Sequence, residues 1–334
     1  MLYHAKFSSF GSYAPKKIVN NFDLEKIVET TDEWIRTRTG MFERHYCSEE
    51  EAASDLAIKA AINAIEASTV SYRDIDLIIC ATISGDHAFP STACIVQQKL
   101  GLKGFPAFDV SAGCTGFVYA LETARQFVES GSRQNVLVMG VDVLTKITNW
   151  QDRNTCVLFG DGAGAAIVSR ATSSDISRII DAVICADGSQ GDLLIQQAGG
   201  SRMPASHETV DKHLHTVYME GNKIYKNAIK SMFASSDELL RRNHLTAADV
   251  DWVIPHQANL RIIEGLADKM KVPMSKVIVN IEKYGNTSSA TIPLATDEAI
   301  RNKKIRRGDI ILLTSFGAGL TWGSILARYL KNLD

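Results

Sequence analysis

Apolar residues along this chain recur in two alternating patterns, short β-branched runs and longer segments with helical spacing. The short runs predict strands at 76–80, 104–110, 135–139, 277–281 and 310–314. Apolar residues three and four positions apart predict helices at 52–66, 115–129, 222–242 and 260–270. Strands that alternate with helices are typical of an α/β protein with parallel sheets.

The two halves of this pattern resemble each other. Three segments have counterparts later in the chain, in the same order and at nearly the same separation: Leu56–Ala60 with Asn227–Ser231, Asp74–Ile79 with Asp249–Ile254, and Asn135–Val138 with Asp309–Leu312. We therefore expect a duplicated α/β unit, with an N-terminal half over residues 1–172 and a C-terminal half over 173–334. Because ligands of open α/β sheets bind beyond the carboxyl ends of the strands, chemistry is expected in the segments that follow the strands.

Composition excludes several classes of function. Hydrophobic residues make up 45% of the 334 residues, yet no apolar run approaches the ~18 residues that a membrane helix needs. The formal net charge of −2 gives no overall attraction to nucleic acid or to an anionic membrane. We expect neither nucleic acid nor a membrane as a partner.

The six cysteines are irregularly spaced and contain no CxxC pair, which argues against a zinc site or a disulfide framework. The first residues, from Met1 to Lys6, lack the long apolar stretch of a signal peptide. Both features favour a reducing, cytoplasmic setting in which at least one cysteine is free to act as a nucleophile.

The first chemical candidate is Cys114, which lies in Ser111–Gly116 between a predicted buried strand and a predicted helix. Small neighbouring residues leave room for a substrate. The N-terminus of a helix lowers the pKa of a thiol and offers free N–H donors. An isolated cysteine is more often a small core residue, but this setting favours a nucleophile.

Two further candidates lie in the second half of the chain. His256 directly follows an apolar run and precedes a predicted helix. Asn286 lies in Tyr284–Thr291, and the duplication sets it almost opposite Cys114. Taken singly, His256 also fits a satisfied histidine at a strand end, and Asn286 also fits ordinary turn chemistry.

Glycine-rich segments follow at Gly160–Gly164 and Ser315–Gly323. The second could bring a backbone N–H close to a substrate oxygen, since glycine permits close approach. Neither segment matches a nucleotide-binding motif. His213 and His215 have no evident third ligand and indicate a surface loop, so no metal site is expected.

Several segments between Gly11 and Trp322 together resemble the bacterial β-ketoacyl-acyl carrier protein synthase III family: His87–Cys94, the turn around Cys114, Phe159–Gly164, Pro255–Ile263, Gly285–Ser288 and Phe316–Gly319. The resemblance implies a thiolase fold, in which two similar α/β halves form five αβαβα layers, and a homodimer. It also implies an acyltransferase of type II fatty acid synthesis. Such an enzyme condenses an acetyl-CoA or short or branched acyl-CoA primer with malonyl-acyl carrier protein and releases CO2.

Carried onto matching positions, the resemblance makes Cys114 the acylated nucleophile. His256 and Asn286 would donate hydrogen bonds to the enolate that forms when the malonyl group loses CO2. The backbone N–H groups of Cys114 and Gly317 would form the oxyanion hole. A soft thiol suits thioester exchange, and neutral donors suit the developing negative charge.

For the acyl-CoA substrate, the resemblance makes Trp34 and Arg153 the pair that sandwiches adenine, and Arg38 a contact to a CoA phosphate. An indole ring and a guanidinium both stack well on a π-face. No permanently bound cofactor is implied, since the CoA thioester is consumed as a substrate.

The resemblance also assigns protein contacts and the acyl tunnel. Arg261, together with Lys226 and Lys269, would form the basic surface for the acidic carrier protein. Phe89 would reach the acyl tunnel of a second copy. Tyr225 stands on the tunnel wall, where the family is expected to have phenylalanine.

Other functions remain open from the sequence. A related condensing enzyme of specialised metabolism could use the same three residues. A degradative thiolase normally needs a second catalytic cysteine in the C-terminal half, and this chain has none after Cys185. A papain-like peptidase also uses Cys, His and Asn, but the local signature around its cysteine is absent here. A non-enzymatic acyl-binding relative would not need all three residues.

Overall fold

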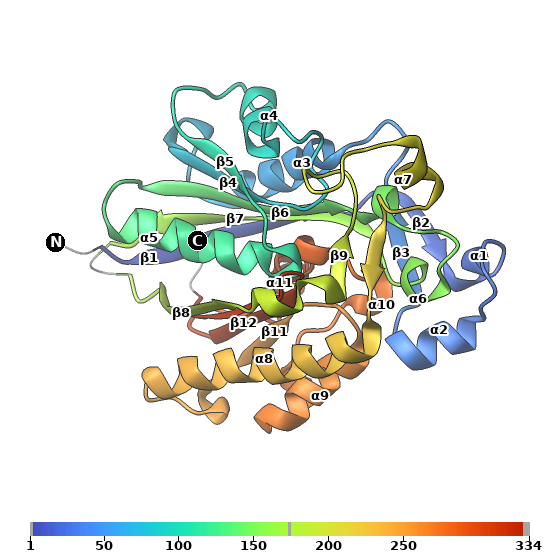
Figure 1. The fold of residues 1–334 in the computed structure, drawn as a ribbon. Coiled ribbons are helices and arrows are strands. Elements are labelled where there is room, and N and C mark those ends of the chain that lie inside the picture. The colour runs from blue at the N-terminus through green and yellow to red at the C-terminus, as the bar shows by residue number, and fades with distance from the viewer. Residues whose placement is uncertain (1–2, 173–174, 330–334) are drawn as a thin grey trace.

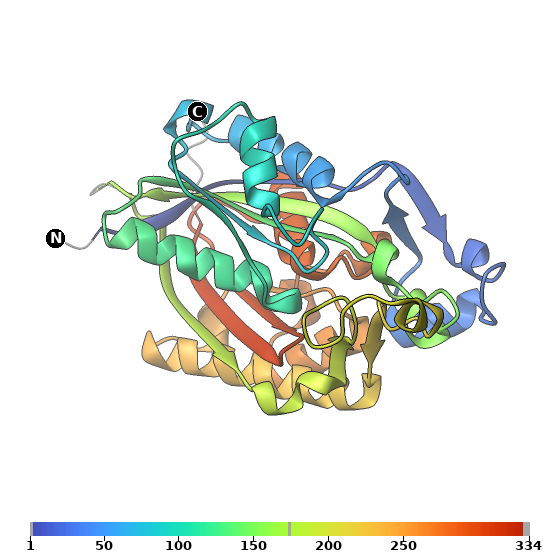
Figure 2. The same ribbon diagram turned by 45° about the horizontal axis from the view of Figure 1, so that its top comes forward.

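The computed structural model describes residues 3–172 and 175–329, and it stacks two large β-sheets with helices between them and on both outer faces (Figure 1, Figure 2). The N-terminal sheet contains β1 (Ala5–Tyr13), β7 (Asp161–Arg170), β6 (Asn135–Val143), β4 (Leu77–Ala81) and β5 (Ala107–Val110), in that order. The C-terminal sheet contains β11 (Trp252–Pro255), β12 (Ile310–Gly317), β13 (Thr321–Arg328) and β8 (Arg178–Ala186).

Both sheets are mixed, whereas the sequence predicted parallel sheets. β4 runs parallel to β5 and β6, but β7 is antiparallel to β6 and β1. In the second sheet β11 runs parallel to β12, while β13 is antiparallel to β12 and β8. The difference has a simple origin at β12 and β13, because only three residues join these strands and such a connection returns the chain antiparallel.

The two sheets share one strand order. The series β4-β6-β7-β1 of the first sheet corresponds to β11-β12-β13-β8 of the second. Val277 forms a single parallel bridge to Val253 of β11, in the place that β5 occupies beside β4. This correspondence supports a duplication. The division at residues 172 and 173 stays a prediction, because residues 173 and 174, like both chain ends, lie outside the described residues.

The strand predicted at 277–281 is wrong. Ile278 N–H donates to Val253 O at 2.9 Å and starts a ladder with β11. Past Pro255 the side chain of Gln257 replaces the backbone of β11, because its Nε2 donates to Ile278 O at 3.2 Å and its Oε1 accepts from Asn280 N–H at 3.1 Å. The chain then enters helix α10 (Ile281–Tyr284).

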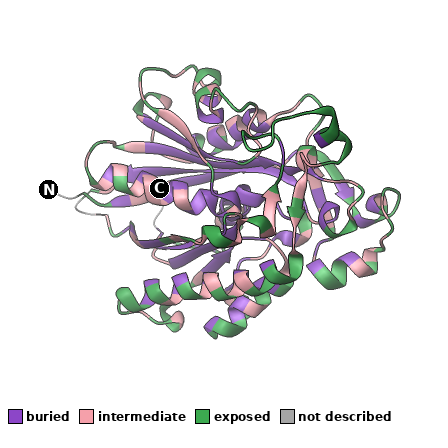
Figure 3. Cartoon of the chain, in the orientation of Figure 1, coloured by how far each residue is buried: buried purple, intermediate pink, exposed green. Residues whose placement is uncertain are grey.

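Helices complete the five layers expected of a thiolase fold. Between the sheets, α5 (Gly116–Glu129) and α11 (Thr291–Arg301) pack into one buried apolar cluster with strands of both sheets, and Figure 2 shows α5 in this position. α3 (Ala53–Glu66) and α4 (Thr92–Lys99) cover the outer face of the first sheet. α8 (Gly221–Arg242) and α9 (Leu260–Met270) cover the second. Figure 3 shows buried residues along the strands and exposed ones on the outer helices.

Smaller elements gather at one end of the sheets, on the right of Figure 1. They are the ribbon of β2 (Lys17–Asn20) and β3 (Glu43–Tyr46), the ribbon of β9 (Leu194–Gln196) and β10 (Val217–Met219), and the helices α1 (Asn21–Leu24), α2 (Asp32–Thr39), α6 (Arg153–Cys156) and α7 (His207–Asp211). Among the described residues, no helix has both the length and the apolar character that crossing a bilayer requires.

Candidate active site

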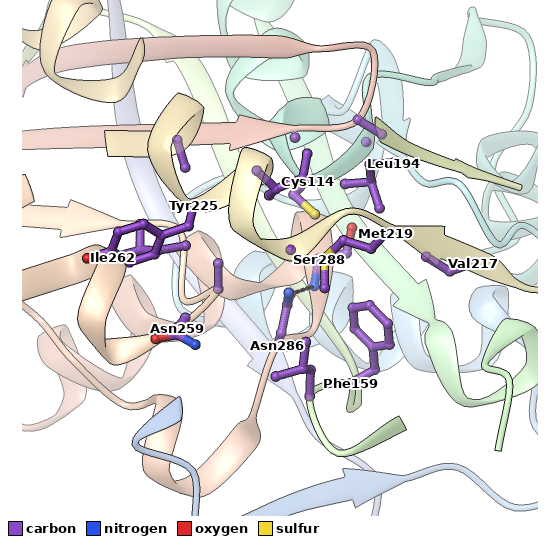
Figure 4. A pocket seen from close by; sticks show the side chains of 18 of the residues that line it. Cys114, Phe159, Leu194, Val217, Met219, Tyr225, Asn259, Ile262, Asn286 and Ser288 are labelled. Atoms are coloured by element: carbon purple, nitrogen blue, oxygen red, sulfur yellow. Dashed lines mark hydrogen bonds between the residues drawn. The ribbon is translucent and has the colours of Figure 1, made fainter. Parts of the chain in front are cut away.

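Cys114, His256 and Asn286 line one cavity of about 1190 Å³, and Figure 4 shows Cys114 and Asn286 in its wall. Cys114 lies in a 3₁₀ turn between β5 and α5, His256 directly follows β11, and Asn286 lies between α10 and α11. The cavity wall is largely apolar and includes Phe159, Leu194, Val217, Met219 and Ile262. The three residues that the sequence singled out for chemistry therefore meet in one place, although they come from both halves of the chain.

The backbone around Cys114 is pressed against β12 of the other sheet. A side chain at Gly317 would put its Cβ 2.5 Å from Cys114 N, so only glycine fits there. Ser315 Oγ donates to Cys114 O at 2.9 Å, and Thr321 Oγ1 donates to Ala112 O at 2.8 Å. The two residues expected to form an oxyanion hole thus have their backbones in direct contact.

The expectation that a helix N-terminus lowers the pKa of the Cys114 thiol is wrong. Cys114 sits in the turn Gly113–Thr115, and α5 starts only at Gly116. Burial raises the pKa of the thiol to about 12. Cys114 is therefore a protonated thiol at neutral pH, and its proton must leave when the sulfur attacks a substrate.

His256 is only 3% exposed. Its backbone N–H donates to Thr314 O at 2.8 Å, which continues the pairing of β11 with β12 and fixes the residue at the strand end. Burial lowers the pKa of the imidazole to about 3, so the ring is neutral at neutral pH and carries one N–H. Nδ1 lies 2.7 Å from Thr291 Oγ1.

Asn286 is held at both its backbone and its side chain. Its N–H donates to Leu158 O at 2.9 Å, and its carbonyl accepts from Gly160 N–H at 3.0 Å. Oδ1 accepts from Ser288 N–H at 2.9 Å. Since the carbonyl end of the amide is engaged, Nδ2 is left as a hydrogen-bond donor without a partner among residues 3–172 and 175–329.

Sequence reasoning missed Asp142, a fully buried carboxylate at the end of β6. It accepts from Ile83 N–H at 2.9 Å and from Ser84 Oγ at 2.8 Å in the first half. It also accepts from Ser289 Oγ at 2.8 Å, and so ties the Asn286 loop to the N-terminal sheet. Burial raises the pKa of this carboxyl. A single aspartate inside an otherwise apolar strand was the available signal.

At the mouth of the cavity, two arginines face one indole. The guanidinium carbon of Arg38 lies 4.7 Å from the ring centroid of Trp34, and that of Arg153 lies 5.1 Å from it. Arg153 Nη1 also donates to Glu29 O at 3.1 Å. Trp34 and Arg38 line the cavity, whereas Arg153 stands beside it. The structure brings the three predicted CoA contacts together, and their role in binding stays a prediction.

The three predicted carrier-protein contacts are exposed on α8 and α9. Arg261 lines the cavity mouth, whereas Lys226 and Lys269 do not. Lys269 Nζ lies 5.1 Å from the ring centroid of Phe233. Within the described ranges none of the three cations forms an ion pair with a carboxylate, so their charge is available to a partner.

The two predicted tunnel residues differ in their placement. Tyr225 lines the cavity and is 39% exposed. Phe89 is 85% exposed in the loop before α4 and does not line the cavity of its own chain. His215, which the sequence placed in a surface loop, is hydrogen-bonded through Nε2 to Thr209 Oγ1 at 2.9 Å.

Two α/β halves of shared strand order, with a thiol where their strand ends meet, define the class of this protein as a condensing acyltransferase with the thiolase fold. The families described as 3-oxoacyl-[acyl-carrier-protein] synthase III and its C-terminal part match residues 108–188 and 240–329. The β-ketoacyl-[acyl-carrier-protein] synthase III of Caldanaerobacter subterraneus subsp. tengcongensis is 54% identical over 321 residues, which cover 96% of each chain.

Solved structures agree. The 3-oxoacyl-[acyl-carrier-protein] synthase III of Aquifex aeolicus is 46% identical with a TM-score of 0.89, over 97% of this chain and 100% of that one. The priming β-ketosynthase of the R1128 polyketide pathway is 32% identical with a TM-score of 0.89, over 99% and 97%. The chain belongs to the 3-oxoacyl-[acyl-carrier-protein] synthase III family, as its sequence motifs suggested.

Proposed function

We propose that this enzyme transfers a primer acyl group from CoA to Cys114 and then condenses it with malonyl-acyl carrier protein, which initiates type II fatty acid synthesis. The observation that carries the proposal is the convergence of Cys114, His256 and Asn286 in one cavity whose mouth is lined by Trp34 and Arg38. The sequence relatives support the choice of substrates, since they are named for the same condensation.

In the first half-reaction, Cys114 Sγ attacks the thioester carbon of the acyl-CoA. A new C–S bond forms, the bond to the CoA sulfur breaks, and the thiol proton ends on CoA. The negative charge that develops on the carbonyl oxygen is held by the N–H groups of Cys114 and Gly317, whose backbones touch.

In the second half-reaction, the malonyl group loses CO2 and the electron pair of the broken bond becomes an enolate. Nδ2 of Asn286 and Nε2 of His256 donate to the enolate oxygen. Both side chains are neutral donors, which stabilise negative charge as it develops. The enolate carbon then attacks the acyl thioester, and Cys114 leaves as a thiolate that takes a proton from solvent.

The surroundings of the cavity suggest how the substrates are held. Trp34 and Arg153 would take the adenine of CoA between them, and Arg38 would contact a phosphate. Stacking on both faces needs about 7 Å between indole and guanidinium, two contact distances of roughly 3.5 Å, so the Arg153 side chain must swing outward. The free cations Arg261, Lys226 and Lys269 would receive the acidic carrier protein.

We propose a homodimer formed across the edge of the N-terminal sheet. β5 is the last strand of that sheet and pairs only with β4, so one row of its backbone groups can pair with a second copy. The nearby loop exposes the apolar ring of Phe89, which would enter the tunnel of the second copy. The cytoplasmic location that we propose is supported by six cysteines that are all unpaired.

A second candidate function is acyl transfer or condensation in a specialised pathway with the same three residues, which the likeness to the priming β-ketosynthase of the R1128 polyketide pathway favours. Mass spectrometry of Cys114 after incubation with a panel of acyl-CoAs, followed by malonyl-acyl carrier protein, separates the two. Turnover of the loaded enzyme by an alternative acceptor, and not by the malonyl carrier, would support the specialised function.

The main test separates the half-reactions. Cys114→Ala removes the sulfur and should abolish acyl transfer to the protein, while CO2 release from malonyl-acyl carrier protein persists. His256→Ala and Asn286→Ala should still be acylated but should condense about 10²–10³ times more slowly, as expected for loss of one such donor. Single-turnover labelling with radioactive acyl-CoA, alongside CO2 release, measures both steps. Condensation by Asn286→Ala at the wild-type rate would contradict the assignment.

A further inference from the structure

The hydroxyl of Thr291 is the only hydrogen-bond partner of the His256 ring among the described residues, with 2.7 Å between Nδ1 and Oγ1. Thr291 is the first residue of α11 and is 3% exposed. Thr291 lies five residues after Asn286, so one short segment carries both Asn286 and the hydrogen-bond partner of His256. The proposed function gives Thr291 no role.

The protonation of the ring makes this contact decisive. A neutral imidazole has one N–H and one bare nitrogen, and the partner of one nitrogen sets the state of the other. The proposed second half-reaction needs the proton on Nε2, the ring nitrogen that is not bonded to Thr291. Nδ1 must then be bare, and a bare nitrogen buried in this position needs a donor.

The Thr291 hydroxyl has one proton and two acceptors within reach. Ser288 O lies 3.0 Å from Oγ1, and His256 Nδ1 lies closer, at 2.7 Å. Ser288 O already accepts the backbone N–H of Thr291, whereas Nδ1 has no other donor among the residues that the structure describes. If the hydroxyl proton goes to Nδ1, then Ser288 O and His256 Nδ1 each accept a hydrogen bond, and neither buried acceptor lacks a donor.

We propose that Thr291 is a positioning residue that donates to Nδ1 of His256 and thereby holds the imidazole in the tautomer with its proton on Nε2. The inference rests on the proposed role of His256 as a donor to the enolate. Thr291 touches no reacting atom and acts only through the ring. Its hydroxyl fixes both the ring's orientation and the direction in which its N–H points.

The test combines an activity split with a direct view of the ring. Thr291→Val keeps the shape of the side chain and removes the hydroxyl, and Thr291→Ser keeps the hydroxyl. Thr291→Val should lower CO2 release and condensation about tenfold, the size expected for one neutral hydrogen bond, while acyl loading of Cys114 stays at the wild-type rate. Thr291→Ser should recover most of the loss.

Thr296→Val is the matched control. Thr296 is a buried threonine of the same helix, and its hydroxyl donates to Ile292 O at 2.7 Å without contact to the ring. This variant should lose stability to a similar degree as Thr291→Val and should keep its CO2 release. An equal loss of CO2 release in both variants would show that Thr291 has only a structural role.

Nitrogen NMR of histidine-labelled enzyme reads the tautomer without reference to activity, with the His256 signals identified by their loss in His256→Gln. We expect a protonated Nε2 and a bare Nδ1 in the wild type, and a mixture of tautomers in Thr291→Val. A protonated Nδ1 in the wild type would overturn the inference. The proposed role of His256 as a donor survives that result if His256→Ala slows condensation as expected. Condensation by His256→Ala at the wild-type rate would instead remove the proposed role of His256 as a donor to the enolate.

Discussion

Replacing Gly317 by alanine should show how much the proposed oxyanion hole contributes to the rate of acyl transfer, apart from the other residues of the site. The added Cβ would lie 2.5 Å from Cys114 N and 2.9 Å from Thr115 N, against an ordinary contact of at least 3.4 Å. The neighbour is backbone and cannot rotate away, so the two chains must separate by close to one ångström. Both N–H groups that we assign to the oxyanion hole lie on these chains.

A displacement of about 1 Å at a reacting centre costs on the order of 10²-fold in rate, and the loss of one oxyanion donor costs about 10²–10³-fold. We therefore expect acylation of Cys114 by acyl-CoA to slow by at least about 100-fold in Gly317→Ala. Crowding a packed region also costs about 1–3 kcal/mol of stability, which thermal unfolding would record separately.

Gly188→Ala is the matched control, because a Cβ at Gly188 meets no atom within 4 Å. It should load at the wild-type rate. Pre-steady-state acylation, followed by mass spectrometry at a temperature where both variants are folded, is the assay. A folded Gly317→Ala enzyme that loads as fast as Gly188→Ala would refute the reasoning, since the close approach would then contribute nothing to acyl transfer.

Three further predictions concern the partners and the buried histidine. Arg261→Ala should weaken the use of malonyl-acyl carrier protein and the salt dependence of that use, while acyl-CoA loading persists. Arg241→Ala, at the far end of α8, is the control. Equal losses with both substrates would count against the assignment. Phe89→Ala should change primer chain-length preference and leave a dimer in sedimentation, whereas a fully active monomeric wild type would exclude the dimer. Burial depresses the pKa of His256 from about 6.5 to about 3. Titration of this residue therefore leaves the free energy of unfolding unchanged above pH 6.5, and lowers it by up to about 1.4 kcal/mol for each pH unit between pH 6.5 and pH 3. Denaturant unfolding of wild type and His256→Gln at pH 7 and pH 5 tests this, and parallel pH profiles would contradict it.

Local patterns were enough to predict the elements whose ends are set by nearby residues. α9 runs from Leu260 to Met270 as expected, because the side chain of Asn259 caps its first turn by accepting from Arg261 N–H. The start of α5 was predicted within one residue from a different signal, the helical spacing of its apolar residues, since no side chain caps it. The convergence of Cys114, His256 and Asn286 followed from motif and duplication together.

What failed depended on contacts between distant segments. The strand at 277–281 is missing because a side chain, that of Gln257, completes the ladder in place of backbone. The pKa of Cys114 follows from how deeply the folded chain encloses the thiol, which its neighbours in sequence do not determine. Asp142 and Thr291 gain their importance only from partners brought close by the fold.

The contact between Gly317 and Cys114 also limits how the enzyme can move. Ser315 and Thr321 of the second sheet hold the backbone at Cys114 and Ala112 by buried hydrogen bonds, and the backbone N–H of Ser289 donates to Asp142 Oδ2 at 3.2 Å. A hinge that opened one half away from the other would break all of these bonds and pull the oxyanion donors apart. Substrates would therefore enter past the exposed rim, where Arg153 covers Trp34, without one half opening away from the other.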